Sequence, residues 1–489
     1  MRKAVTDTDV LIIGAGPVGL FLAKECARRA MRCRVVECRP SQSEHSKALA
    51  IFPRTLEIFD MAGVASPFVE RANRVTCATV ISHGRTLARM QFTPHESPYA
   101  YVAMVPQDVT EKLLVDSLRL RGGSVEYDTT FVSATQSNDC VHAMLDHQGD
   151  RREITAAYVV GCDGAHSAVR HLLNLPFEGA EYHDSFLLAD VETNDALPAA
   201  EMQLCPHELG PLAIFPMSAT RRRIVGMVEK TEDNAPSISL IRQLLADRAP
   251  ASIEAHSLHW SSYFRIHHRQ VAKLRVGRMF VAGDAAHIHS PFGGQGMNTG
   301  LQDVWNLVWK LDFALRGFGG ENLLDSYTAE RRPVIKHVID VTDFMTRAMA
   351  TPSKLAQAAR NTIIPVVSRL APFQHAFVQT LSELGVAYRG SPMVEGPGER
   401  YLDDGLRGGG ICSRFLLLID GASDAPAAEA AKQLCASFSD VLELRSVHLP
   451  HAPEIMLVRP DGYAAYASGS RDSASALADV RLVLERHAS

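Results

Sequence analysis

The sequence has no excess of positive charge, no paired cysteine motif and no long uninterrupted apolar run, and each absence excludes a class of protein. Lys and Arg number 50 against 55 Asp and Glu, and this net charge of −5 argues against a surface built for nucleic acid. The nine cysteines include no C-x-x-C pair, so their spacing indicates neither a zinc site nor a disulfide framework. Without a run of about 20 apolar residues, no membrane helix is expected.

The stretch closest to a targeting signal is Val10 to Ala23, which is interrupted by three glycines and one proline and preceded by acidic residues. A secretory signal would need basic residues and no such breaks. We therefore expect a cytoplasmic protein that contacts neither membrane nor nucleic acid and holds no metal. Hydrophobic residues at 46% and charged residues at 21% exclude global disorder, and 489 residues suggest about three domains.

Hydrophobic periodicity predicts an α/β fold. Residues 9–37 read as strand, helix and strand, which is a βαβ unit. Alternating apolar residues then predict antiparallel strands. We expect a Rossmann-like dinucleotide-binding domain formed by residues 1–177 and 277–385, with an antiparallel-sheet domain inserted at 178–276. A linker rich in Gly and Pro is expected at 386–410, followed by a small α/β domain at 411–489.

The first chemical motif is the sequence GAGPVG at residues 14–19, which matches G-x-G-x-x-G. Gly14 permits a tight turn, Gly16 lets a pyrophosphate approach the backbone, and Gly19 allows close packing of helix on strand. The helix that follows directs its N-terminus at the phosphates. Glu37 closes the second strand, where an acid accepts hydrogen bonds from a ribose. The motif predicts a nucleotide site but does not choose between NAD and FAD.

Two later motifs make that choice. Residues 159–170 read VVGCDGAHSAVR, an apolar strand that runs into an Asp-Gly turn and the start of a helix. Residues 278–298 read RMFVAGDAAHIHSPFGGQGMN, in which a strand delivers Asp284 toward a ribityl hydroxyl. The glycines after it let backbone amides approach a flat ring, and a helix N-terminus there favours an anionic reduced flavin.

In this order, these motifs resemble the class A flavin-dependent aromatic hydroxylases, single-component FAD monooxygenases of the para-hydroxybenzoate hydroxylase fold. The resemblance covers about residues 5–350. The run LVRPDGYAAY at 457–466 is similar to the C-terminal thioredoxin-like domain of the larger members. That domain lacks a redox pair here, so we expect a structural or assembly role, with a homodimer as one assembly.

The resemblance implies the contacts to FAD. The glycine-rich turn and Glu37 would hold the ADP half, and Lys47 would contact the pyrophosphate where Arg is commoner. Gln107 would meet the flavin side, while Asp284 and the backbone after it would hold the isoalloxazine. The expected FAD-binding residues are Gly14, Gly16, Pro17, Val18, Gly19, Glu37, Cys38, Lys47, Gln107, Val132, Asp163, Asp284, Pro291, Gly294, Gly296, Met297 and Asn298.

The implied reaction uses NADPH or NADH and dioxygen. A second G-x-G-x-x-G after a strand is absent, so the sequence offers no dedicated Rossmann domain for the nicotinamide donor. The resemblance implies that this donor binds transiently. Reduced FAD would form a flavin hydroperoxide, whose distal oxygen is attacked by a phenolate ring. Simple phenol hydroxylases place an Asp shortly before the R-T-L-E motif, but Ala48–Pro53 contains no acid. This departure favours a larger, polycyclic and more apolar aromatic substrate, and no catalytic residue is assigned.

The substrate pocket is expected between the flavin and the middle sheet, with Phe215, Met217, Trp260 and Tyr263 as walls. Arg221–Arg223 could grip an anionic substrate, but we favour a solvated hairpin turn because charge clusters between strands usually face water. No histidine is named as a base.

Three other functions stay open. Baeyer–Villiger oxygen insertion fits the same scaffold. A flavin halogenase is disfavoured because W-x-W-x-I-P is absent. A non-redox flavoprotein that binds or cyclises a polyketide-like substrate would act without NAD(P)H or dioxygen.

Overall fold

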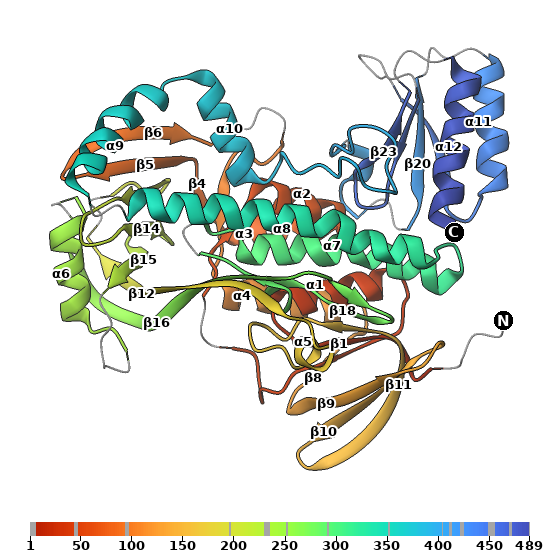
Figure 1. The fold of residues 1–489 in the computed structure, drawn as a ribbon, viewed down its shortest axis with the longest axis horizontal. Coiled ribbons are helices and arrows are strands. Elements are labelled where there is room, and N and C mark those ends of the chain that lie inside the picture. Colours follow the sequence, from red (N-terminus) through yellow and green to blue (C-terminus); the bar gives the residue numbers. More distant parts are fainter. Residues whose placement is uncertain are drawn as a thin grey trace.

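The computed structural model describes residues 6–43, 47–92, 97–194, 197–228, 235–250, 253–290, 293–350, 353–402, 404–409, 413–420, 425–447, 455–468 and 472–488. These residues form a mixed α/β fold with several sheets. Two long helices, α7 (Gly296–Arg316) and α8 (Glu321–Met349), run side by side across the molecule (Figure 1). Gly317, with φ of 83°, ends α7 in the left-handed conformation and separates it from α8.

The first sheet contains the predicted βαβ unit. β1 (Thr8–Ile13), α1 (Pro17–Arg28) and β2 (Cys33–Val36) begin it, and α1 packs against α4 (Gln107–Arg119) and α7. The strand order is β17-β18-β11-β1-β2-β8, with β9 and β10 extending from β11 as an antiparallel hairpin. The remaining bounds are β8 (Val125–Glu126), β9 (Thr129–Gln136), β10 (Val141–His147), β11 (Asp150–Gly161), β17 (Arg275–Val276) and β18 (Met279–Val281).

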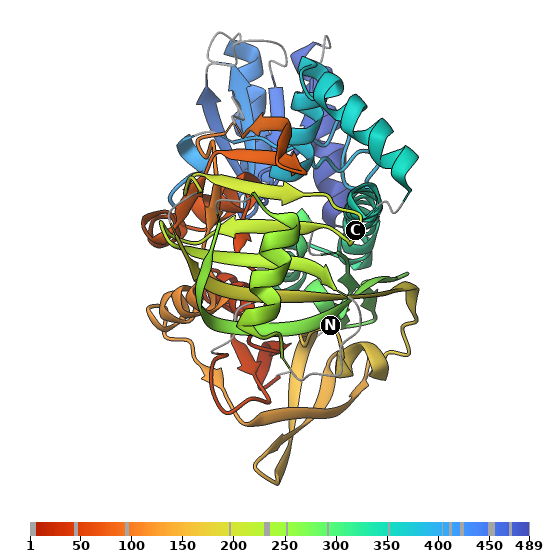
Figure 2. The ribbon, with the colours of Figure 1, turned by 90° about the vertical axis from the view of Figure 1, so that its left-hand side faces the viewer.

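The second sheet is mainly antiparallel, in the order β19-β16-β12-β15-β14-β13-β5-β6. Its strands are β5 (Cys77–Ser82), β6 (Arg85–Gln91), β12 (Phe177–Thr193), β13 (Glu201–Cys205), β14 (Leu212–Pro216), β15 (Arg221–Val228), β16 (Ala255–Val271) and β19 (His287–Ile288). The expected stretch 178–276 therefore does not form this sheet alone, because β5 and β6 complete one edge. The local sequence of a strand does not specify which sheet it joins. Helix α6 (Ile238–Arg248) covers one face (Figure 2).

Short elements connect these sheets. A small third sheet has the order β3-β7-β4. Its strands and the neighbouring helices are β3 (Ala50–Ile51), α2 (Pro53–Met61), α3 (Ala65–Arg71), β4 (Asn73–Val75), β7 (Val102–Met104), α5 (Ala168–Leu172) and the 3-10 turn η1 (Gly283–Ala285). Helices α9 (Lys354–Val367) and α10 (Ala371–Ser382) follow α8 and lie near β5 and β6 (Figure 1).

The C-terminal part forms a four-stranded sheet in the order β21-β20-β22-β23. The elements are β20 (Phe415–Asp420), α11 (Ala425–Ser437), β21 (Leu442–Val447), β22 (Ile455–Val458), β23 (Ala464–Ala467) and α12 (Ser473–Ala488). The stretch expected as a linker contains the 3-10 turn η3 (Asp404–Leu406) and is not a free connection. Its backbone bonds to the end of the sheet, for example from Tyr401 N–H to Gly462 O at 2.7 Å.

The apolar core follows these layers. One cluster of buried side chains joins the first sheet to α1, α4 and α7, and further clusters lie on each face of the second sheet and beneath α11 and α12. Among the described residues, no helix combines the length and apolar character that crossing a membrane requires.

Candidate cofactor and substrate site

The glycine-rich turn is built as its sequence predicts. Gly14 follows β1 with φ of 100°, and a Cβ there would lie 2.5 Å from Cys162 O. A Cβ on Gly19 would lie 2.0 Å from Gly14 O, so α1 can approach β1 only with glycine at this position. By contrast, a Cβ on Gly16 would meet no described atom within 4 Å. Pro17 begins α1, whose N-terminus has no side-chain cap, so its first amides stay available to an anion.

Glu37 lies directly against this turn. Its Oε2 accepts from Ala15 N–H at 2.9 Å, and its Oε1 accepts from Arg39 N–H at 3.1 Å. Although burial opposes the shift, these bonds and the Arg39 guanidinium hold the pKa of Glu37 below its ordinary value. Cys38 is exposed beside it, and the exposed Val132 lies on β9. Thr129 N–H, at the start of β9, donates to Glu37 O at 2.9 Å, so this strand reaches the same loop.

The motif at residues 159–170 contacts the glycine-rich turn at residues 14–19. The Cα of Asp163 lies 3.0 Å from the position of a Cβ on Gly14. Asp163 Oδ2 accepts from Val169 N–H at 3.2 Å, while its Oδ1 has no hydrogen-bond partner in the described part of the chain. Burial raises the pKa of this carboxyl, and Ser167 caps α5 by accepting from Arg170 N–H.

The motif at residues 278–298 packs against the glycine-rich turn at residues 14–19 through small residues. Val18 Cγ2 lies 3.0 Å from the position of a Cβ on Gly283 and 2.7 Å from that of one on Gly300. The glycines therefore let η1, α1 and α7 converge. Asp284 is exposed at this junction. The surrounding protein partly removes water from this carboxyl and so raises the pKa of Asp284, although His287 and Lys47 act to lower it.

The start of α7 is tied to the chain that precedes α2. Asn298 is buried, accepts from Phe52 N–H at 2.9 Å through Oδ1, and donates to Ala50 O at 2.9 Å through Nδ2. Gly294, with φ of 64°, accepts a second bond from the same amide. Gly296 is the first residue of α7, and Met297 is buried in the next position. Pro291, also expected to contact FAD, lies outside the described residues.

The loop before β3 connects the cofactor residues to the second sheet. Lys47 is exposed, and Gln107 Oε1 accepts from the N–H of its neighbour Ala48 at 3.1 Å. Arg223 of β15 donates to Lys47 O at 2.9 Å and to Ala48 O at 3.0 Å. Arg223 also forms two bonds to the carboxylate of Asp190 at 2.7 and 2.8 Å.

The expected solvated hairpin at Arg221–Arg223 is therefore wrong for two of the three arginines. Arg223 is buried, and its guanidinium is occupied by Asp190 and the two carbonyls. Arg222 is also buried, and it donates to backbone oxygens including Leu197 O at 2.7 Å. Sequence reasoning missed the role of Arg223 because its partners lie on another strand and on a distant loop, whereas Arg222 folds back onto carbonyls of its own hairpin, such as Ala219 O at 2.9 Å, as well as onto Leu197 O. Neither arginine is left to grip an anionic substrate.

The proposed pocket walls divide between two faces of the second sheet. Phe215, Met217 and Trp260 pack against one apolar cluster, whereas Tyr263 packs against the cluster on the α6 side. Tyr263 therefore does not share a face with the other three expected walls. The strand register explains why, because Tyr263 pairs with Leu187, whose side chain faces α6. Five further side chains pack against the same apolar cluster as Trp260 and were not found from the sequence. They are Met227 and Phe264 of the sheet, and Met349, Ile364 and Phe377 of helices α8, α9 and α10.

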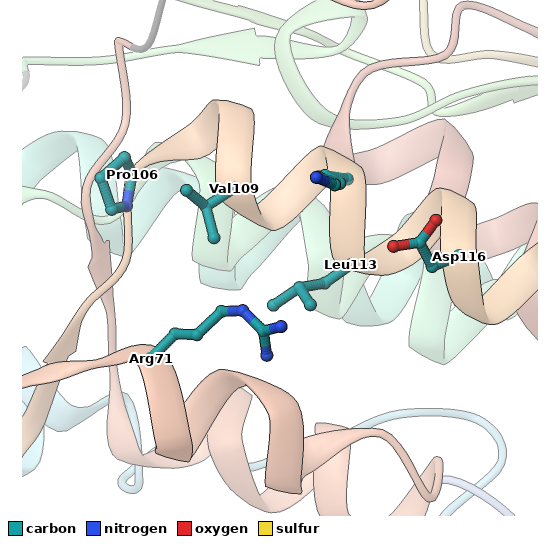
Figure 3. A pocket seen from close by; sticks show the side chains of 6 residues that line it. Arg71, Pro106, Val109, Leu113 and Asp116 are labelled. Carbon is teal, nitrogen blue, oxygen red and sulfur yellow. The ribbon is translucent and has the colours of Figure 1, made fainter.

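A cavity of about 300 Å³ lies between α3 and α4. Figure 3 shows Arg71 of α3 opposite Val109 and Leu113 of α4. None of the expected FAD or substrate residues lines it. Its two cations, Arg71 and Lys112, and the acid Asp116 are all exposed, so this cavity supplies no built polar site.

One group of potential metal ligands occurs among the described residues, formed by His83, His207 and Glu208. Leu209 N–H donates to His207 Nδ1 at 3.2 Å, and only an unprotonated nitrogen can accept this bond. The proton of the neutral ring then sits on Nε2, the atom that faces Glu208 at 3.7 Å. That tautomer leaves no lone pair for a metal there.

Glu383 provides a test of buried charge beside α7. Burial raises the pKa of Glu383 to about 8, although Gln302 donates to it. The folded state thus keeps a proton that the unfolded chain loses near pH 4.3. The contribution of the protonated Glu383 to the free energy of unfolding is fully present below about pH 4.3. It is lost as pH rises through 8, at up to about 1.4 kcal/mol per pH unit.

We expect the difference in free energy of unfolding between Glu383→Gln and the wild type to shift in favour of the variant between pH 5 and 8.5. Urea unfolding at both pH values measures this, and parallel pH profiles would contradict it.

The comparisons agree with this geometry. The FAD binding domain family matches residues 7–342. The chain is 32% identical to 6-methylpretetramide 4-monooxygenase of Streptomyces rimosus, over 96% of this chain and 92% of that protein. It is 31% identical to rifampicin monooxygenase of Streptomyces venezuelae, over 94% and 95%. The structure of OxyS anhydrotetracycline hydroxylase from Streptomyces rimosus superposes with a TM-score of 0.78 at 30% identity, covering 94% of this chain and 96% of that one. The chain therefore belongs to the FAD binding domain family and, as a class A flavin-dependent aromatic hydroxylase, is a monooxygenase with FAD as its cofactor.

Proposed function

We propose that this enzyme uses NADPH or NADH and dioxygen to hydroxylate a phenolic, polycyclic aromatic substrate. One observation carries the proposal. Asn298 joins the start of α7 to Ala50 and Phe52, and both of these residues belong to the apolar cluster that contains Phe215 and Trp260. The expected isoalloxazine end and the expected substrate face therefore border the same buried region.

The chemistry of this face supports a large, uncharged substrate. Its partly buried members are aromatic or aliphatic side chains and methionines, which adapt to flat ring systems. The arginine within it, Arg223, is neutralised by Asp190. Similar proteins are named for 6-methylpretetramide, rifampicin and anhydrotetracycline, and we extend this polycyclic class to the present chain.

The residues described above fit FAD. The open space at Gly16 suits a pyrophosphate, Glu37 suits a ribose, and the exposed Asp284 suits a ribityl hydroxyl. When bound, FAD supplies the electron transfer from NAD(P)H and the activation of dioxygen. The protein binds and orients the rings and excludes water from the apolar face. We assign the cofactor contacts to the residues predicted from the sequence, and we assign no catalytic base.

The C-terminal sheet supports a thioredoxin-like domain at 411–489. Its central strands β20 and β22 are antiparallel, β21 adds a parallel strand, and α11 and α12 pack together beside the sheet (Figure 1). We retain the division into a flavin domain at 1–177 and 277–385 and an inserted sheet at 178–276, with β5 and β6 added to that sheet. A homodimer and a cytoplasmic location also stay proposals.

The test is anaerobic reduction of the bound flavin. We expect NADPH or NADH to bleach the visible flavin band, and a tetracyclic phenol to accelerate bleaching by about tenfold or more, which corresponds to lowering the activation barrier by about 1.4 kcal/mol. Stopped-flow absorbance measures both rates, and a simple phenol serves as the matched control.

Products formed after admitting air separate the alternatives. A hydroxylated ring supports the proposal, whereas an ester or ring-opened product indicates Baeyer–Villiger insertion. A flavin that neither donor bleaches with any compound overturns the proposal and favours a non-redox flavoprotein.

A further inference from the structure

Asp303 of α7 holds the loop that carries Asp284. Its Oδ2 accepts from Gly283 N–H at 3.2 Å and lies 2.7 Å from His287 Nε2. Asp303 and His287 are both buried. Although burial opposes it, Arg331 and His287 lower the pKa of Asp303, so the carboxylate stays charged. Both ends of the loop, Gly283 and His287, are thus fixed to one side chain.

Arg331 of α8 is the next link. It is buried, and its Nε donates to Asp303 Oδ1 at 2.8 Å. A second nitrogen, Nη2, donates to Thr299 O at 3.2 Å in the first turns of α7. The third, Nη1, donates to Tyr388 Oη at 3.3 Å. The guanidinium therefore orients Asp303 by bonding to three groups at once, two of them on α7 and the third the hydroxyl of Tyr388.

Tyr388 connects this arginine to the C-terminal sheet. Its ring centroid lies 4.4 Å from that of Tyr463, and the Arg459 guanidinium lies 5.0 Å from its centre. Arg459 also binds Glu330, the residue before Arg331, at 2.5 and 2.9 Å. Glu330 thus contacts the C-terminal part directly, and its neighbour Arg331 reaches the loop at 283–287 through Asp303.

We infer that Arg331 is a positioning residue that transmits the restraint of the C-terminal segment to the flavin-binding loop. The inference rests on the proposed role of Asp284 in holding FAD. Asp284 sits between the two points that Asp303 restrains, so its placement depends on the orientation of that carboxylate. Small displacements of a binding group reduce affinity strongly, and supporting hydrogen bonds prevent them. The C-terminal segment would then be part of the cofactor site although it contributes no predicted contact to FAD.

Three variants test this inference. Arg331→Lys keeps the positive charge beside Asp303 but cannot reach all three partners. Tyr388→Phe removes only the hydroxyl and keeps the ring contacts. Tyr99→Phe is the matched control, because the Tyr99 hydroxyl donates to Asp60 Oδ2 at 2.9 Å, away from the Asp303 network. The measurements are FAD affinity by flavin fluorescence, and hydrogen exchange of residues 282–289 in the FAD-free full-length protein.

We expect Arg331→Lys to raise the FAD Kd about tenfold, as the loss of a charge-assisted hydrogen bond implies, and Tyr388→Phe to raise it less. Both variants should exchange faster at 282–289, while Tyr99→Phe matches the wild type. If both variants keep wild-type affinity and exchange, the inference is overturned, even when their melting temperatures fall. If Arg331→Lys does not fold, Tyr388→Phe decides.

Failure of the proposed function would look different. A wild-type protein that binds FAD but is not reduced by NAD(P)H would reject the hydroxylase reaction and leave this test intact. Exchange at 282–289 in the FAD-free protein also reports on the restraint without any turnover.

Discussion

Gly19→Ala should yield a protein that no longer retains FAD. The added Cβ would lie 2.0 Å from Gly14 O and 3.3 Å from Cys162 Cβ, and the nearer contact is backbone, so α1 must move away from the turn. Overpacking of this kind costs about 3 kcal/mol in the free energy of unfolding, or more. Urea unfolding of the FAD-free protein and the flavin content after gel filtration measure the two effects.

Gly16→Ala is the matched control for this prediction. A Cβ on Gly16 meets no described atom within 4 Å, so the FAD-free variant should unfold at the wild-type urea concentration. Its FAD affinity should still fall, because a methyl group stands where the pyrophosphate is proposed to approach. Equal flavin content in Gly19→Ala and the wild type would refute the assigned role of this turn.

Arg223→Met is expected to destabilise the fold by about 3 kcal/mol, because it removes both hydrogen bonds to the buried carboxylate of Asp190 and leaves only Arg221, 3.8 Å away, as a cationic partner. The loss also releases the Lys47 and Ala48 carbonyls, so FAD affinity should fall as well. Urea unfolding gives the free-energy change, and flavin fluorescence gives the affinity.

Two companion variants define what the Arg223 result means. Adding Asp190→Leu to Arg223→Met should recover part of the stability, since no buried charge then lacks a partner. Arg222→Met removes a neighbouring buried arginine whose described bonds go to backbone oxygens, so it should not be rescued by Asp190→Leu. If the double variant is no more stable than Arg223→Met, the ion pair does not explain the loss.

The conformation of the glycine-rich turn was predictable because its residues act locally. The turn at Gly14–Gly19 requires glycine for contacts made within the motif and with the adjacent strand, and Glu37 follows at the spacing set by one helix and one strand. The assembly of the second sheet was not predictable, because β5 pairs with β13 and the paired residues Cys77 and Glu201 lie 124 positions apart.

The sequence by itself determined the nucleotide-binding turn and the alternation of strands and helices, since each depends on short-range spacing, and its three motifs carried the resemblance to the flavin hydroxylases. Only the tertiary structure decided that Tyr263 faces away from Trp260, that Arg223 is saturated by Asp190, and that Arg331 joins Asp303 to Tyr388. The physical reason is common to all three. The face of a strand and the partner of a buried charge are set by segments distant in the chain, and local spacing carries no information about which segment arrives.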